Sequence, residues 1–127
     1  MKINKKQIES VLKLDGQKRY EHSIKMIADR EEVYGLYNNG WGLVSDGKQT
    51  LFPIWSAKEY AQINAIEDFE NFKPKAISLK DFIEDVLPTL KDNNDGVTVF
   101  LTPENNGVTP DIDRLISDIK VELQNYE

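Results

Sequence analysis

The sequence predicts a single α+β domain in which an antiparallel meander, extended to a mixed sheet of roughly five strands, is covered by about five helices. Residues 32–55 consist of three short runs rich in β-branched and aromatic residues, separated by Asn39-Gly40 and Asp46-Gly47. These dipeptides supply the positive φ angles that tight hairpin turns require, so the stretch is typical of a three-stranded meander. Amphipathic runs before and after it predict helices that cover the sheet.

Two helices are expected before the meander. Asn4 can cap the first, with Gln7 three residues later in the capping-box position, and this helix runs to about Leu14. An Asp-Gly pair then breaks it, and a second helix continues to about Arg30. The apolar stripe of the second helix consists of Tyr20, Ile24, Ile27 and Ala28.

The region after the meander alternates between helices and strands. Ser56 is positioned to cap a short helix, residues 67–72 fit either a helical turn or a loop, and residues 75–79 form a short strand candidate. A broad apolar stripe predicts a helix over residues 79–90. Pro88 should kink or end this helix, because its ring removes one hydrogen-bond donor and clashes with the preceding turn.

The last part of the chain predicts one strand and one helix. Residues 97–101 are continuously apolar and β-branched, which favours a central position in the sheet. Thr109 and Pro110 form a good cap and first-position pair for a terminal helix. The apolar stripe of that helix is Ile112, Leu115, Ile116, Ile119 and Leu123.

Composition restricts the classes of protein. With 39% hydrophobic and 30% charged residues and without a low-complexity run, residues 1–127 should form one compact domain. The absence of cysteine excludes disulfides, thiolate metal sites and thiol nucleophiles. Together with the lack of a long apolar run, it favours a cytoplasmic protein that does not enter a membrane.

Charge bears on the partner. The net charge of -6 makes nucleic acid a poor partner. Residues 1–30 hold eight Lys or Arg against four Asp or Glu, whereas residues 31–127 hold eight against eighteen. Two interpretations follow. The basic leading helices lie against an acidic body or in solvent, or the acidic part offers a face to a basic partner.

The sequence contains no recognisable catalytic, metal or cofactor site. His22, the only histidine, is turned away from the apolar stripe of its helix onto a polar face with Met26 and Asp29, where we expect it to be exposed. No Gly-x-Ser-x-Gly elbow presents a serine nucleophile. The acidic turn at residues 92–96 does not fit a calcium loop, because Pro103 takes the place of the bidentate glutamate. We therefore predict no enzymatic activity, no metal and no cofactor.

The aromatic residues of the meander are the main candidate for a binding site. Strand alternation can place Tyr37, Trp41 and Trp55 on one face, with Tyr34 and Phe52 on the other. In one interpretation all these residues are core, since they are large and the domain is small. In the other, part of the set lines a groove for a ligand or peptide, and at least one tryptophan is partly exposed. The candidate residues of such a groove are Tyr37, Trp41, Trp55, Arg19, Asp29 and Lys75.

A set of short motifs extends along nearly the whole chain. They are Lys18-Arg19-Tyr20-Glu21, Ile24-Lys25, Ala28-Asp29, Glu32-Val33-Tyr34-Gly35-Leu36, Gly40-Trp41, Phe52-Pro53-Ile54-Trp55, Tyr60-Ala61, Pro74-Lys75-Ala76-Ile77, Leu79 with Phe82, Leu87-Pro88, and Phe100 with Pro103. Together they resemble a family of small bacterial proteins known as domain of unknown function 2750. The resemblance implies one domain and a bacterial source, and it brings no activity, cofactor or catalytic residue with it.

The second half of the chain has a layout of its own. A Phe-Pro-x-Trp strand is followed by a helix, a short strand, a second helix and a late strand before a Thr-Pro turn. This order is faintly similar to the N-terminal domain of the enhanced-serine-sensitivity SseB proteins. Such domains look like small α+β modules that bind other macromolecules, so the similarity favours binding over catalysis.

These observations lead to one functional expectation and two alternatives. We expect a non-enzymatic cytosolic binding or adaptor module whose partner is a protein or peptide. The first alternative is an acidic immunity-type inhibitor of a basic toxin or nuclease, which would use charge complementarity for fast encounter. The second is an enzyme with an unrecognised carboxylate-based site.

Overall fold

The computed structural model describes residues 3–126, which fold into short helices and five strands. The helices are α1 (Lys5–Leu12), α2 (Gly16–Arg30), α3 (Lys58–Gln62), α4 (Leu79–Asp81), α5 (Leu87–Asp92) and α6 (Ile112–Leu123). The strands are β1 (Glu32–Tyr37), β2 (Val44–Ser45), β3 (Thr50–Ile54), β4 (Lys73–Ser78) and β5 (Gly96–Val99). Single 3-10 turns occur at Glu67–Phe69 and Gln124–Tyr126, and a π-helical turn at Phe82–Val86 joins α4 to α5.

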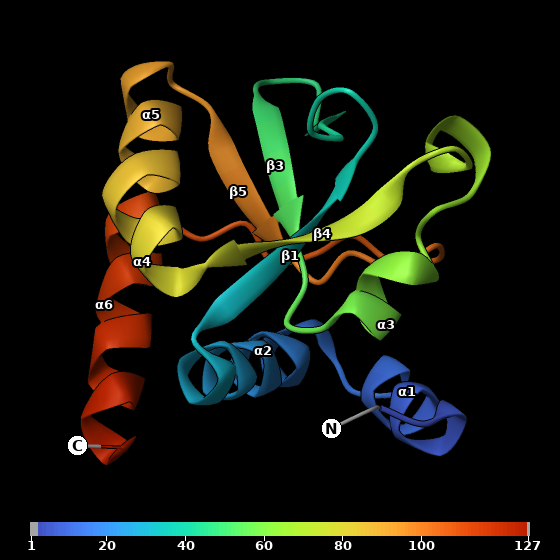
Figure 1. The fold of residues 1–127 in the computed structure, drawn as a ribbon, viewed down its shortest axis with the longest axis horizontal. Coiled ribbons are helices and arrows are strands. Elements are labelled where there is room, and N and C mark those ends of the chain that lie inside the picture. The colour runs from blue at the N-terminus through green and yellow to red at the C-terminus, as the bar shows by residue number, and fades with distance from the viewer. Residues whose placement is uncertain (1–2, 127) are drawn as a thin grey trace.

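The five strands form two small sheets that meet at one point. β1 pairs with β4 in an antiparallel sheet, whereas β3 pairs antiparallel with β2 and parallel with β5. Tyr34 and Trp55 exchange backbone N–H···O bonds of 2.9 Å in each direction, and this bridge joins β1 to the end of β3. The α+β class with five strands of mixed direction is confirmed, and Figure 1 shows the strands fanning out from the middle of the molecule.

The predicted meander is wrong in its first pairing. The Asp46-Gly47 turn does connect β2 to β3, and the Asp46 carboxylate accepts the backbone N–H groups of Lys48 and Gln49 at 2.8 and 2.9 Å. The Asn39-Gly40 turn bends the chain but gives only an isolated bridge between Tyr37 and Trp41. β1 takes the more distant β4 as its partner instead.

The central position predicted for residues 97–101 is also wrong. β5 ends the order β2-β3-β5, and its other side has only an isolated antiparallel bridge between Val99 and Val108. All four β5 residues are nevertheless buried. The continuous apolar run therefore predicted correctly that the strand is buried, but it did not predict the strand's position in the sheet.

Local capping explains where the first two helices begin. Asn4 forms the predicted capping box with Gln7, and Asp15 caps α2 by accepting the N–H of Lys18 at 2.9 Å. α2 ends at Arg30, as predicted.

Two predicted caps are wrong. Ala57 is the N-cap of α3, while Ser56 is fully buried and its Oγ has no hydrogen-bond partner among the described residues. The terminal helix starts after Asp111, two residues later than Thr109 and Pro110 suggest. A capping motif takes account only of residues adjacent in sequence. At both helix starts the path of the chain in the folded protein differs from the one that the motif predicts.

The helical stretch from Leu79 to Asp92 runs through Pro88, with a local distortion. The N–H of Leu87 bonds to the carbonyl of Phe82, five residues back, instead of the usual four. Proline cannot donate to the carbonyl four residues before it and clashes there, so widening the preceding turn accommodates the ring. The predicted disturbance at Pro88 thus takes the form of a π-helical turn.

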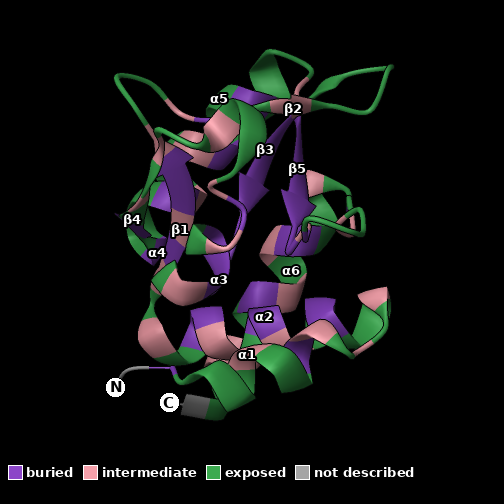
Figure 2. Cartoon of the chain, turned by 90° about the vertical axis from the view of Figure 1, so that its right-hand side faces the viewer, coloured by how far each residue is buried: buried purple, intermediate pink, exposed green. Residues whose placement is uncertain are grey.

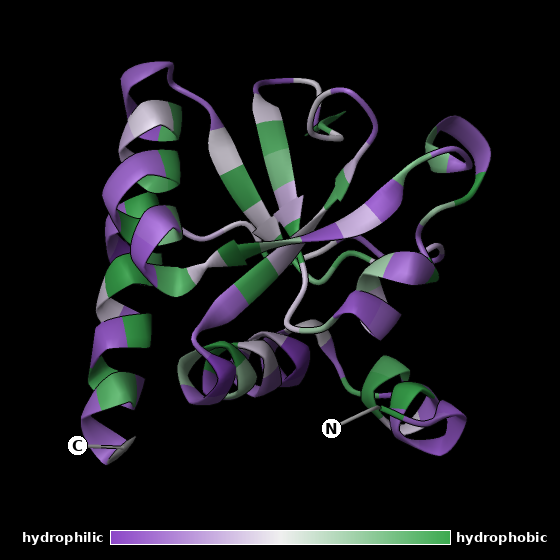
Figure 3. Cartoon of the chain, viewed as in Figure 1, coloured by the Kyte–Doolittle hydropathy of each residue, from purple (hydrophilic) through white to green (hydrophobic). Residues whose placement is uncertain are grey.

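One hydrophobic core lies between the strands and the helices. α4, α5 and α6 flank one side of the strands and α2 lies below them (Figure 1), while buried and exposed residues alternate along α2 and α6 (Figure 2). The apolar residues of α5 and α6 lie mainly toward the strands (Figure 3). The largest fully buried side chains are Trp55, Tyr60, Phe82, Phe100, Ile27, Leu36 and Ile54.

Candidate functional site

The structure brings three of the six candidate residues together on the outside of β1 and β4. The rings of Tyr37 and Trp41 meet edge-to-face with centroids 5.1 Å apart. The Lys75 ammonium lies 4.0 Å from the centroid of the Tyr37 ring and 5.6 Å from that of Trp41. Tyr37 and Trp41 are half-buried and Lys75 is exposed, so we call this set the aromatic–lysine surface.

Backbone geometry positions this surface. Gly35 lies directly opposite Lys75 in the β1–β4 register. A Cβ on Gly35 would lie 2.9 Å from Cε3 and Cζ3 of Trp41, so the indole rests on bare backbone. Gly42 then returns the chain to β1 by donating its N–H to the Leu36 carbonyl at 2.7 Å.

Trp41 connects the surface to the core. Its ring centroid lies 5.4 Å from that of Phe52, which is 4% exposed. Strand alternation predicted these two residues on opposite faces, and that prediction is wrong because the segment between β1 and β2 is not a paired strand. The partly exposed indole is therefore supported from below by a buried ring.

Trp55 belongs to the core. It is 1% exposed, and its indole Nε1 donates a hydrogen bond of 2.9 Å to the carbonyl of Leu101. The two tryptophans thus divide between the two interpretations of the aromatic set. Trp55 is core, and Trp41 is partly accessible.

Arg19 and Asp29 lie elsewhere. Arg19 is 5% exposed, and its guanidinium donates to the carbonyls of Leu14 and, at 3.4 Å, Leu12, just after and at the end of α1. Carbonyls at a helix C-terminus carry partial negative charge, so Arg19 holds α1 against α2. Asp29 is exposed on α2 and takes no part in the aromatic–lysine contacts.

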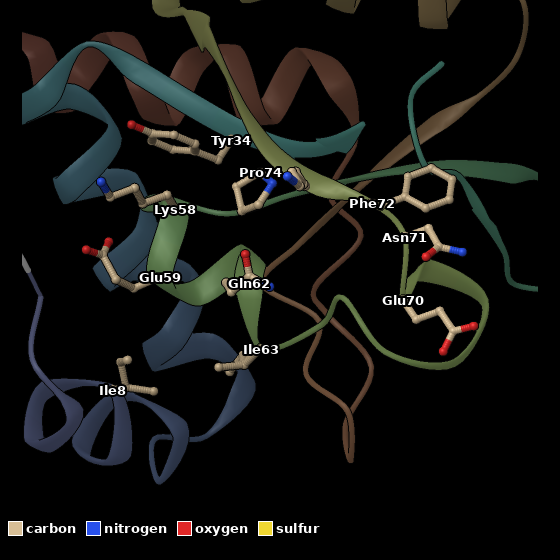
Figure 4. Close-up of a pocket in the computed structure, with 11 residues that line it drawn as sticks. Ile8, Tyr34, Lys58, Glu59, Gln62, Ile63, Glu70, Asn71, Phe72 and Pro74 are labelled. Atoms are coloured by element: carbon tan, nitrogen blue, oxygen red, sulfur yellow. The ribbon is translucent and has the colours of Figure 1, made fainter. Parts of the chain in front are cut away.

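A hollow that the sequence did not predict lies beside α3. It has a volume of about 870 Å³ and lies between α1, α3, β1 and the segment that leads into β4 (Figure 4). We call it the α3 groove; its lining is Ile8, Tyr34, Lys58, Glu59, Gln62, Ile63, Glu70, Asn71, Phe72, Lys73 and Pro74. Four separate segments contribute to it, so no local pattern could have indicated it.

The α3 groove combines apolar walls with charges of both signs. Tyr34, Phe72 and Pro74 give it apolar surface, and lysine and glutamate side chains surround them. The Tyr34 hydroxyl donates to the Glu32 carboxylate at 2.8 Å. Burial, and then this hydrogen bond to an anion, raise the pKa of Tyr34, so its phenol is a neutral donor.

His22 is not on an exposed face, and that prediction is wrong. It is half-buried with its ring centroid 6.2 Å from that of Tyr60, and its Nδ1 is buried without a hydrogen-bond partner among the described residues. Burial and the nearby Lys25 lower the pKa of His22. The imidazole is therefore a packed neutral ring, and among the described residues no carboxylate bonds to its Nδ1 as a triad would require.

Residues 3–126 contain neither a metal-binding cluster nor a helix that could span a membrane. Within this range, histidine, aspartate and glutamate do not gather in groups of three that could hold a metal ion. The described helices are too short or too polar to cross a membrane.

Comparison with known proteins shows the family of the chain. No curated protein matches the chain, so the faint similarity to the SseB N-terminal domain gains no support. The model of one family, described as "Protein of unknown function (DUF2750)", matches residues 20–119. This range includes all five strands and the aromatic–lysine surface. The chain therefore belongs to the DUF2750 family.

Proposed function

We propose that this chain is a non-enzymatic binding module that acts in the cytoplasm and holds a protein or peptide partner at the aromatic–lysine surface. The observation that carries the proposal is the position of Trp41. It is a large aromatic side chain left partly accessible beside Tyr37, while the other tryptophan is buried. The absence of cysteine favours the cytoplasmic setting.

The chemistry of the surface suits protein recognition. Tryptophan and tyrosine are enriched among the residues that dominate binding energy, because they bury much area at little conformational cost. The contact with Phe52 and the bare backbone at Gly35 hold the Trp41 ring in place before a partner arrives. Such preorganisation reduces the entropy lost on binding.

Affinity capture with matched variants tests the proposal. The immobilised protein and its Trp41→Ala variant are exposed to lysate of the source cell, and bound proteins are quantified by mass spectrometry. Val121→Ala is the control, because Val121 is a 60% exposed apolar residue on α6, away from the surface. We expect one partner to be retained by the wild type and the control and lost by Trp41→Ala. Equal recovery on all three proteins would contradict the proposal.

The two tryptophans also give a direct signal. Acrylamide should quench the fluorescence of Trp41 and leave that of Trp55 largely unaffected, since Trp55 is 1% exposed. The Trp41→Phe variant should therefore lose the accessible component. A captured partner should protect Trp41 from the quencher, and continued full quenching in the complex would exclude Trp41 from the interface.

A further inference from the structure

We propose that the outer edge of β4 is the docking line of this module, and that its partner is an extended acidic segment that adds to β4 as a further strand. The inference rests on the proposed function, because it names the partner class for the same part of the molecule. It uses the backbone of β4 in addition to the aromatic–lysine surface. The mode of binding would be β-strand addition.

β4 is an edge strand with one side paired. Its sheet has the order β1-β4, so within the described residues no strand lies beyond β4. Leu79 donates its N–H to the Glu31 carbonyl at 2.8 Å, which fixes the alternation of the antiparallel ladder. The backbone N–H and C=O groups of β4 therefore point toward β1 at Ile77, Lys75 and Lys73. At the alternate positions, Pro74, Ala76 and Ser78, the backbone groups point outward.

The other side of β1 confirms this alternation. Tyr34 exchanges both of its backbone bonds with Trp55, away from β4, as its position between Val33 and Gly35 requires. Pro74 fits the same pattern, because proline has no N–H and is tolerated where that position faces solvent. The outward groups available to a new strand are the Pro74 carbonyl, both groups of Ala76 and the Ser78 N–H.

The edge is accessible and locally basic. Lys73, Lys75, Ala76 and Ser78 are exposed. Residues 71–80 contain three lysines and no acidic residue, in a chain with a net charge of -6. Unlike Lys91, which pairs with Asp113, these three lysines have no carboxylate partner within residues 3–126. Carboxylates on an incoming strand would supply one.

The two faces of the β1–β4 ribbon suggest which side chains the partner presents. Side chains of an added strand would alternate between these faces. Lys75 and Trp41 lie on one face, and the α3 groove with Tyr34 and Pro74 lies on the other. The charged residues of the groove include both lysines and glutamates, whereas Tyr34, Phe72 and Pro74 provide apolar surface for an apolar side chain. Alternation of acidic and apolar residues therefore matches the site.

Lysines and a proline on an edge strand also discourage aggregation, so the experiment must separate docking from protection. The probe is a fluorescein-labelled hexapeptide of alternating valine and glutamate, and the control peptide has lysine in place of glutamate. Fluorescence polarisation with the full chain should show saturable binding of the acidic peptide, weakened by added salt. Equal binding of both peptides, or no binding of either, would overturn the proposal.

Backbone and charge variants locate the binding line. Ala76→Pro removes one outward N–H and leaves the ladder to β1 intact, whereas Ala76→Ser keeps that N–H. We expect at least a tenfold rise in the dissociation constant for Ala76→Pro and little change for Ala76→Ser. Lys73→Glu combined with Lys75→Glu should weaken binding similarly, and the matched reversal Lys5→Glu with Lys6→Glu, on exposed positions of α1, should not. Unchanged affinity of the Lys73→Glu, Lys75→Glu variant would refute docking along β4.

The outcomes distinguish this inference from the proposed function. Thermal melts establish that each variant is folded. If Ala76→Pro does not fold, the charge reversal at Lys73 and Lys75 decides whether the partner binds along β4. A natural partner that is lost with Trp41→Ala but retained by the β4 variants would leave the proposed function standing and reject the edge. Loss of that partner with both Trp41→Ala and the β4 variants supports docking along β4. Retention of the partner by all variants rejects both docking along β4 and the proposed function.

Discussion

At the scale of single residues, the candidate surface depends on a missing side chain. Gly35 and Gly40 both precede Trp41 closely, yet their surroundings differ. A Cβ at Gly35 would meet the indole at 2.9 Å, whereas one at Gly40 would meet nothing within 4 Å. Gly40 also lacks the positive φ angle that would itself disfavour alanine.

This difference gives a matched pair of variants. In Gly35→Ala the new methyl group would clash with the Trp41 indole, and because Gly35 is held in the paired strand β1, the indole must move. This variant should therefore lower the free energy of unfolding by about 1–3 kcal/mol. Gly40→Ala should change it by no more than about 0.5 kcal/mol. Denaturant titration and acrylamide quenching check both expectations. A stable Gly35→Ala protein with unchanged quenching would show that the indole does not depend on this contact.

His22 predicts a pH dependence. Its pKa is lowered in the folded protein by burial and by Lys25, whereas the unfolded chain takes up the proton near pH 6.5. The stability is therefore complete above about pH 6.5 and is lost as the pH falls toward and through the lower folded value. Between pH 7 and 5, the wild type should lose more stability than His22→Gln. Parallel curves in denaturant titrations at stepped pH would contradict this.

The sequence could not reveal the environment of His22. A helical wheel describes only the helix to which the residue belongs, and on that basis His22 faces away from the apolar stripe. Tyr60 comes from α3, far along the chain, and covers the face that the wheel leaves open. Trp41 shows the same limitation, since its contact with Phe52 depends on an unpaired segment after β1.

At the scale of elements, α2 and α6 are held together by a polar contact at the edge of the core. The Tyr20 hydroxyl donates to the Asp118 carboxylate at 2.6 Å. Arg114 lies 5.3 Å from the Tyr20 ring centroid and 3.4 Å from Asp118. Burial and the hydrogen bond to Asp118 raise the pKa of Tyr20, so the phenol keeps its proton at any ordinary pH.

Tyr20→Phe tests this contact. Loss of a hydrogen bond to a charged acceptor should lower the free energy of unfolding by about 1–2 kcal/mol, while the ring keeps its packing. A double-mutant cycle with Asp118→Ala isolates the pair, and we expect a coupling energy of at least about 0.5 kcal/mol. Additive single effects would mean that the two side chains do not stabilise each other.

Elements defined by their neighbours were predictable, and pairings between distant strands were not. The predicted cap at Asn4 depends on a residue three positions away, and it is correct. The β2–β3 hairpin is likewise local. β1 and β4 are separated by β2, β3 and α3, and the residues of β1 read equally well as the first strand of a meander. Nothing in periodicity specifies which distant strand is the partner.

At the scale of the whole molecule, two small sheets share one core. The buried cluster includes Val33 from β1, Ile54 from β3, Ile77 from β4 and Val97 from β5, together with residues of every long helix. Within residues 3–126, both sheets contribute to this one cluster. The chain should therefore unfold as one unit despite the single bridge between the sheets.

Cooperativity can be measured directly. Far-ultraviolet circular dichroism, which reports helices and strands, and near-ultraviolet circular dichroism, which reports the aromatic packing, should give the same urea midpoint. Two separate midpoints would show that one sheet with its helices melts before the other.

The candidate site was predictable only in part, for the same reason as the fold. Tyr37 and Trp41 come together through a local turn, although the meander pairing from which their shared face was predicted is wrong. Lys75 joins them through the β1–β4 register, which also creates the α3 groove. Trp55, Arg19 and Asp29 lie elsewhere, because membership of a site depends on the same distant pairing.

The late arrival of β4 has a consequence for biosynthesis. In a chain that grows from its N-terminus, the edge of β1 that pairs with β4 stays open until residues 73–78 have been made. During that interval the nascent polypeptide exposes an unpaired strand edge, with which a neighbouring copy or a chaperone can form hydrogen bonds.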